Sequence, residues 1–145
     1  MRSSVGKIQL LLAAAALSAP LVSLTSCRHY PTLSKDYLDR PPEAISVIVT
    51  FDPEKKVAVT SNKWEILRGG KDSIQWTSPN GVVSVDFGKD DPFEGPPTYD
   101  EKNRILRSKP AKRVAERKVI DYKARLTLFD GGTVVEIDPR IEIWP

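Results

Sequence analysis

Apolar and polar residues alternate along most of the chain after residue 43. Successive side chains of a β-strand point to opposite faces of a sheet, so this alternation indicates strands with one buried face. The first run places Ile45, Val47, Val49 and Phe51 on one face. The same pattern predicts further short strands at residues 57–59, 64–66, 74–76, 83–87, 119–129, 134–137 and 141–144.

Turn-forming residues separate these runs, and Asn80-Gly81 is the strongest hairpin signal among them. Only residues 99–106 and 111–117 could be helical, and neither has a convincing apolar stripe. Short strands with turns roughly every 8–12 residues are typical of a sandwich or a barrel. We therefore expect an all-β domain over residues 44–145, built as a single Greek-key β-sandwich.

The first 26 residues have the pattern of an export signal. Arg2 and Lys7 provide the positive start, and residues 8–22 form a nearly continuous apolar run. The tetrapeptide Leu-Thr-Ser-Cys at residues 24–27 resembles the lipobox of bacterial lipoproteins, which has small residues before a cysteine. That resemblance implies cleavage before Cys27, a diacylglycerol on its thiol and acylation of the new amino group.

Two other interpretations of the leader remain open. An ordinary secretory signal could be cut near Ala19, but Pro20 directly after the cut is unfavourable. A retained membrane helix needs about 20 apolar residues, and this run is shorter and contains a proline. We expect residues 1–26 to be a lipoprotein signal peptide, and acylated Cys27 to hold the chain on the lipid bilayer. Arg28, rather than aspartate, follows the cysteine, which in Gram-negative bacteria implies the outer membrane, facing the periplasm.

The segment after the cysteine contains several charges and three prolines and shows no sustained periodicity. Residues 27–43 are therefore predicted to be the lipidated cysteine and a flexible tether. In the alternative, the apolar residues of this segment form a short helical turn that packs on the domain: Tyr30, Leu33, Tyr37 and Leu38.

Three stretches of the domain are similar to the cupredoxin fold. Residues 70–76 resemble the glycine-acidic-x-valine-x-tryptophan strand of that family, and residues 83–87 resemble the strand that follows it. Residues 122–126, together with 141–143, resemble its closing hairpin. The resemblance covers roughly residues 45–145 and implies a scaffold rather than an activity. Immunoglobulin-like sandwiches can show the same glycine turn before a buried tryptophan.

The copper chemistry of cupredoxins is not expected in this chain. A blue-copper site needs two His and one Cys, usually with a weak axial Met. The chain has one residue of each type, and His29, Cys27 and Met1 all precede the domain. Val83 stands where the resemblance places the first histidine. We therefore expect no copper and no other cofactor.

Composition narrows the classes of partner. Arg2 and Lys7 account for two of the 22 Lys and Arg residues, which leaves 20 against 19 Asp and Glu in the mature chain. A net charge so close to zero gives no general argument for nucleic-acid binding, and we expect the protein to bind no nucleic acid. A single cysteine cannot close an internal disulfide, so the core must stabilise the domain alone.

One stretch of the domain is locally basic, with Glu116 as the only acidic residue among its cations. It is a candidate contact with an anionic surface, such as lipid headgroups, a cell-wall polymer or an acidic partner protein. The other interpretation is a solvated loop and edge strand, where lysines prevent strand pairing. The stretch comprises Lys102, Arg104, Arg107, Lys109, Lys112, Arg113, Arg117 and Lys118.

Acidic and aromatic residues offer weaker candidates. Without His or Cys in the domain, no Ser-His or Cys-His dyad can form, and only carboxylate pairs remain for catalysis. The carboxylates considered for catalysis are Glu136, Asp138 and Glu142. One loop of the domain is rich in acidic residues: Asp86, Asp90, Asp91 and Glu94, with Asp100 and Glu101 further on. The spacing of these carboxylates matches no known calcium-binding loop, so calcium is not expected there. Phe93 and Tyr99 are either a recognition tip or a plug over the open end of the sandwich.

These observations favour a membrane-anchored lipoprotein of the bacterial cell envelope that is not an enzyme. Its β-sandwich is expected to bind or position another envelope component, which could be a protein or an anionic polymer. The alternative is a ligand-binding or hydrolase-inhibitor module, for which an apolar pocket with a few convergent polar groups would be the sign. A small enzyme with a carboxylate site ranks last.

Overall fold

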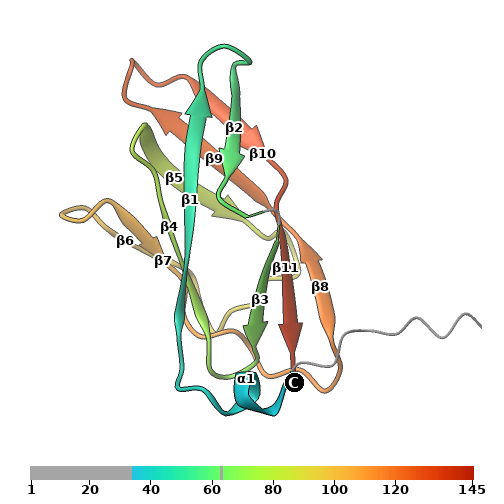
Figure 1. Cartoon of the computed structure of the whole chain (residues 1–145). Coiled ribbons are helices and arrows are strands. Elements are labelled where there is room, and N and C mark those ends of the chain that lie inside the picture. The colour runs from blue at the N-terminus through green and yellow to red at the C-terminus, as the bar shows by residue number, and fades with distance from the viewer. Residues whose placement is uncertain (1–33, 63) are drawn as a thin grey trace, which may run out of the picture. The chain divides into compact units, whose positions relative to one another are not determined.

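The structure is a computed structural model, and it describes residues 34–62 and 64–145. The predicted lipobox, including Cys27, lies outside the described residues. A short helix, α1 (Lys35–Asp39), precedes the strands (Figure 1). The strands are β1 (Ala44–Asp52), β2 (Val57–Thr60), β3 (Trp64–Arg68), β4 (Ser73–Thr77), β5 (Gly81–Asp86), β6 (Thr98–Asp100), β7 (Ile105–Arg107), β8 (Lys118–Asp121), β9 (Lys123–Leu128), β10 (Val134–Ile137) and β11 (Arg140–Trp144).

The first layer of the sandwich is a five-stranded sheet in the order β2-β1-β4-β7-β6. β1 is antiparallel to β2 and parallel to β4, with Val47 opposite Trp76. The turn from β1 to β2 is held by Asp52, whose Oδ1 accepts hydrogen bonds from the backbone N–H groups of Glu54 and Lys55. This turn and α1 lie at opposite ends of the domain, because the nine-residue strand β1 separates them (Figure 1).

The second layer is built on a long antiparallel hairpin that kinks midway. β9 pairs with β10 in one half and β8 pairs with β11 in the other. The kink lies at Tyr122 on one side and at Asp138-Pro139 on the other, and the Tyr122 N–H donates to the Pro139 carbonyl at 3.1 Å. β5 pairs with β9, whereas β3 pairs in parallel with β11 on the opposite side of the hairpin. β8 is therefore left as an edge strand.

The core between the layers is centred on four aromatic side chains. Trp76 on β4 is fully buried, and its ring centroid lies 6.2 Å from those of Phe87 and Phe93 and 6.0 Å from that of Tyr122. The inward residues of β9, including Leu126, complete this core from the opposite layer. The predicted all-β sandwich is confirmed. Phe93 is buried against Trp76, so it is not an exposed recognition tip.

The structure also differs from the predicted elements. The region 98–107, which included a candidate helix, forms the β6–β7 hairpin instead. The predicted strand at 119–129 is divided at Tyr122 into β8 and β9. Of the two alternatives for the segment before the domain, the structure shows the helical turn, α1, in contact with β3 through a hydrogen bond from the Tyr37 hydroxyl to the Ile66 carbonyl. No helix among the described residues is long and apolar enough to span a membrane.

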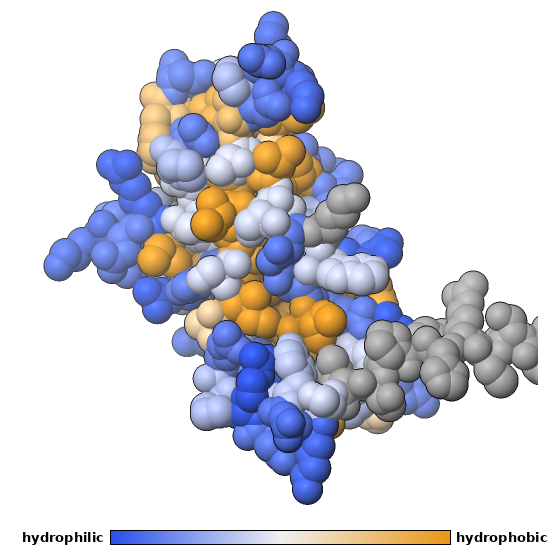
Figure 2. All heavy atoms as spheres, viewed as in Figure 1, coloured by the Kyte–Doolittle hydropathy of each residue, from blue (hydrophilic) through white to orange (hydrophobic). Residues whose placement is uncertain are grey.

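The outer face of the first layer carries little charge along its middle. Figure 2 shows hydrophobic and neutral residues gathered over β1 and β2, with hydrophilic residues at both ends of the domain. Three of the exposed apolar residues come from these two strands, namely Ile48, Val57 and Val59. They alternate with the buried residues Val49 and Ala58, as the period of a strand requires.

Candidate functional site

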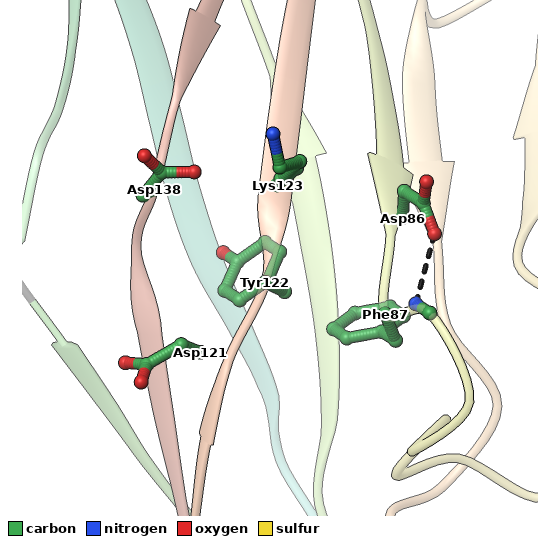
Figure 3. A pocket seen from close by; sticks show the side chains of 7 residues that line it. Asp86, Phe87, Asp121, Tyr122, Lys123 and Asp138 are labelled. Carbon is green, nitrogen blue, oxygen red and sulfur yellow. Dashed lines mark hydrogen bonds between the residues drawn. The ribbon is translucent and has the colours of Figure 1, made fainter.

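A cavity of about 540 Å³ lies beside the kink of the long hairpin. Its position follows from the topology, because β5 ends at Asp86, opposite Lys123 on β9, and no strand pairs with the edge of β8 beyond it. Residues from the end of β5 and from both sides of the kink surround this space (Figure 3). We refer to the cavity as the kink pocket; it is lined by Asp86, Phe87, Gly88, Asp121, Tyr122, Lys123 and Asp138.

The floor of the kink pocket is aromatic. The rings of Phe87 and Tyr122 lie 4.9 Å apart, between centroids (Figure 3). Phe87 also packs on Trp76. The Trp76 Nε1–H donates to the Tyr122 hydroxyl at 2.9 Å, which fixes the Tyr122 side chain. Burial raises the pKa of Tyr122 to about 12. Tyr122 is therefore a neutral phenol near pH 7 and cannot act there as a base.

The rim of the kink pocket is charged, and most of its charges are fixed. Arg140 Nε donates to Asp121 Oδ1 at 2.7 Å, and the Gly88 N–H donates to Asp86 Oδ1 at 2.8 Å. Lys123 Nζ donates to Glu136 Oε1 at 2.6 Å. The hydrogen bond with Glu136 raises the pKa of Lys123, so its ammonium stays protonated and cannot serve as a nucleophile.

The sum of these groups suits binding better than catalysis. Counted over the lining residues alone, three carboxylates and one ammonium make the rim formally negative, while Arg140 pairs with Asp121 and Arg125 lies 4.0 Å from Asp86. An apolar floor with a few convergent polar groups is the usual form of a ligand site. Among the lining residues, Tyr122 and Lys123 both keep their protons near pH 7.

The carboxylates that the sequence offered for catalysis are held in separate contacts. Glu136 accepts hydrogen bonds from Lys123 and from Arg125 Nε, the latter at 2.8 Å, and these bonds lower its pKa. Glu142 is buried, and its Oε2 accepts from Arg117 at 2.7 Å. Of the three candidates, only Asp138 lines the kink pocket. Glu136 and Asp138 therefore lie near the same ammonium, that of Lys123, whereas Glu142 is held apart by Arg117.

The residues of the basic stretch are spread over the domain. The stretch begins in the β6–β7 hairpin at the edge of the first layer and ends in β8 at the edge of the second. Arg104 lies over the Phe129 ring, 4.8 Å from its centroid, and Lys112 Nζ donates to the Asp91 carbonyl. Arg117 is bound to Glu142, as described above, and Lys118 lies 3.9 Å from Asp90. Contact of this stretch with an anionic surface stays a prediction, and these internal contacts give it no support.

The acidic loop is organised by local hydrogen bonds. Asp91 Oδ1 accepts from the Phe93 N–H at 2.9 Å, and Asp100 accepts from both the backbone and the side chain of Asn103. Within residues 34–62 and 64–145, no group of three or more His, Cys, Asp or Glu side chains could hold a metal ion.

Sequence reasoning did not identify the kink pocket. Tyr122 fits the alternating pattern of a strand that also includes Ile120 and Ala124, so it reads only as a core residue. Its meeting with Phe87 depends on the register of β5 against β9 and on the kink, neither of which the local pattern contains. The local sequence pattern also gives no sign that the charged side chains of Arg68 and Asp72 are buried.

Comparison with known proteins adds no information about the kink pocket. No protein-family model matches the sequence, and no curated protein matches it significantly.

Proposed function

We propose that this chain is a lipid-anchored protein of the bacterial cell envelope, and that its β-sandwich binds another envelope component without catalysing a reaction. The lipobox-like residues 24–27 support the anchor, with Cys27 as the acylated residue. The residue after Cys27 places the protein at the outer membrane, facing the periplasm, in a Gram-negative cell. The cupredoxin-like scaffold inferred from residues 70–76 and 83–87 belongs to the same proposal.

The kink pocket is the observation that carries the binding function. Its aromatic floor can pack against an apolar group, and its rim offers the carboxylates of Asp121 and Asp138 on one side and that of Asp86 on the other (Figure 3). Because the rim is formally negative, we expect the bound group to donate hydrogen bonds or to carry positive charge. The ion pairs of Asp121 and Lys123 hold these side chains in place before a ligand arrives, which reduces the entropy lost on binding.

A site-specific crosslink tests the pocket. A photoreactive amino acid replaces Lys123 on the rim or, as the control, Lys55 in the β1–β2 turn, in the full chain expressed in cells. We expect a defined adduct from position 123 and not from position 55. The adduct should weaken several-fold when Asp121→Asn and Asp138→Asn are combined, and it should persist in Asp39→Asn. Equal adducts at both positions, or an adduct indifferent to the rim carboxylates, would contradict the assignment of the pocket.

The anchor is tested separately from the pocket. Cells are fed an alkyne analogue of palmitate, and the mature protein is analysed by mass spectrometry. We expect the wild-type chain to begin at Cys27 and to carry acyl mass there, and the Cys27→Ala variant to carry none. A mature N-terminus at any other residue would exclude the lipoprotein assignment.

A further inference from the structure

A buried arginine holds the segment that precedes the first strand. Arg68, at the end of β3, has a side chain only 2 % exposed. Its NH1 donates to the carbonyls of Tyr37 at 3.2 Å, of Leu38 at 3.3 Å and of Arg40, and its NH2 donates to the Pro41 carbonyl at 2.7 Å. These carbonyls belong to the last turn of α1 and to the residues after it, and a helix end leaves such groups without internal partners. We call this arrangement the arginine clamp.

Asp72 fixes the clamp from the other side. Its Oδ2 accepts from Arg68 Nε at 2.8 Å, and its Oδ1 accepts from Arg68 NH2 at 2.6 Å, so the pair is bidentate. Asp72 also accepts from the backbone N–H of Glu43 at 3.0 Å. The segment from Tyr37 to Glu43 is thereby bound at both ends. A buried charge without its partner costs several kcal/mol, so the clamp resists opening.

Further contacts hold the same segment from its outer side. Lys71 Nζ donates to the Leu38 carbonyl at 2.9 Å, and the Tyr37 hydroxyl donates to the Ile66 carbonyl at 3.0 Å. The Arg40 guanidinium lies 4.0 Å from the centroid of the Tyr37 ring. Ser34 caps α1 by accepting a hydrogen bond from the Tyr37 N–H. These contacts therefore hold the chain in place at least from Ser34 onward, ten residues before β1.

The clamp shortens the reach of the chain between lipid and domain. From Cys27 to Ser34 the chain spans at most about 25 Å, whereas a chain free up to Ala44 would span about 60 Å. β1 alone is about 30 Å long, so even a fully extended chain from Cys27 to Ser34 is shorter than the domain. The exposed residues of that end carry both signs of charge, with Lys35 and Lys71 beside Asp36 and Asp39.

We propose that the arginine clamp is a positioning device that keeps the α1 end of the sandwich against the lipid bilayer. This inference rests on the proposed function, because it requires the acyl anchor at Cys27. The bilayer surface is the partner that the short reach selects, and the mixed charges of the α1 end favour zwitterionic headgroups over a purely anionic surface. The β1–β2 turn, at the opposite end of the domain from α1, then points away from the membrane.

Fluorophores at two matched positions test this orientation. The full acylated chain has no free thiol once Cys27 is modified, so Lys35→Cys in α1 and Lys55→Cys in the β1–β2 turn each introduce one labelling site. Each protein is reconstituted into phosphatidylethanolamine–phosphatidylcholine vesicles that contain lipids with a nitroxide on the headgroup. We expect several-fold stronger quenching at position 35 than at position 55, with little change on adding salt. Equal quenching, or stronger quenching at position 55, would overturn the proposal.

Two further variants separate the clamp from the anchor. An insertion of about 20 Gly and Ser residues before Ser34 roughly doubles the mean reach of the chain and leaves the folded domain untouched, so quenching at position 35 should fall toward that at position 55. Arg68→Gln should have the same effect, provided that its circular dichroism shows intact strands. If quenching at position 35 is unchanged by the insertion, tether length does not set the orientation. Loss of acylation would remove the protein from the vesicles altogether, which distinguishes failure of the anchor from failure of the clamp.

Discussion

Glu65 lies on the buried side of β3, with only 7 % of its surface exposed, and its Oε1 has no hydrogen-bond partner among the described residues. Burial raises the pKa of this carboxyl, and a contact with Asn62 opposes the shift. A folded-state pKa above the unfolded one means that the group's contribution to stability is complete at low pH and is lost as the pH rises through the folded-state value. The ionised carboxylate therefore weakens the fold at neutral pH.

We expect Glu65→Gln to raise the melting temperature by a few degrees near pH 7 and to change it much less near pH 4. Thermal unfolding followed by circular dichroism at both pH values measures this difference. Glu142→Gln serves as the matched control, since hydrogen bonds from Arg117 lower the pKa of Glu142. The ionised Glu142 carboxylate stabilises the fold at neutral pH, and this effect disappears as the pH falls. The free energy of unfolding of Glu142→Gln should therefore be about 2 kcal/mol lower than that of the wild type near pH 7. Identical pH profiles for the two variants would contradict both assignments.

The hydroxyl of Tyr122 is the acceptor for the indole N–H of Trp76, and both side chains are buried. Tyr122→Phe leaves that N–H without a partner, which should cost about 1–3 kcal/mol in the free energy of unfolding. Urea denaturation gives the value. The double variant Tyr122→Phe with Trp76→Phe should cost less than the sum of the single substitutions, because the orphaned donor is absent. Strict additivity would show that the hydrogen bond contributes nothing.

At the scale of elements, the pairing of β5 with β9 depends on a glycine. A Cβ added to Gly81 would lie 2.1 Å from the backbone carbonyl oxygen of Thr127, and neither backbone can move without breaking the sheet. We expect Gly81→Ala to destabilise the domain by at least about 3 kcal/mol. Gly88 has φ +61 but nothing within 4 Å of an added Cβ, so Gly88→Ala should cost only about 1 kcal/mol of backbone strain. Chemical denaturation of both variants gives the comparison, and equal losses would refute the contact.

The clamp makes a prediction about local opening. Although burial would raise the pKa of Asp72, hydrogen bonds from Arg68 and Glu43 hold it below its usual value. Asp72→Asn removes the charge that orients Arg68, so α1 and the residues before β1 should open more often. Hydrogen–deuterium exchange should become at least about tenfold faster at the Glu43 amide, a change of about 1.4 kcal/mol, and remain unchanged in β9. Unchanged exchange at Glu43 would show that Asp72 does not support this segment.

The sequence predicted those strands whose alternation of apolar and polar residues is visible within the strand itself. β1 and β4 alternate cleanly, since Val47 and Trp76 face a core while their neighbours face water. The strands β6 and β7 have only three residues each, which is too short for alternation to separate them from a loop. α1 has five residues and no buried side chain, and its stability comes from Arg68, which lies 31 positions after Tyr37. Such distant contacts cannot be inferred from periodicity.

At the scale of the whole molecule, the candidate site depends on tertiary structure even more than the fold does. The kink pocket forms because β5 stops where the hairpin bends, so that Phe87 and Tyr122 meet beside an edge strand. Composition indicates which chemistries to doubt, since the domain has no His or Cys. It could not indicate where a ligand would bind, because the lining residues are common types gathered from three separate stretches.

Arg68 binds backbone carbonyls of the chain before β1, so these contacts limit how far the protein can be shortened at its N-terminal side for study. A fragment that starts at Ala44, where the alternating pattern begins, would discard every carbonyl that the guanidinium binds and would expose a buried cation to water. A fragment that starts at Ser34 retains them all. Recombinant versions cut at the visible onset of the strands should therefore aggregate or melt early, whereas versions ten residues longer should behave as the intact domain does.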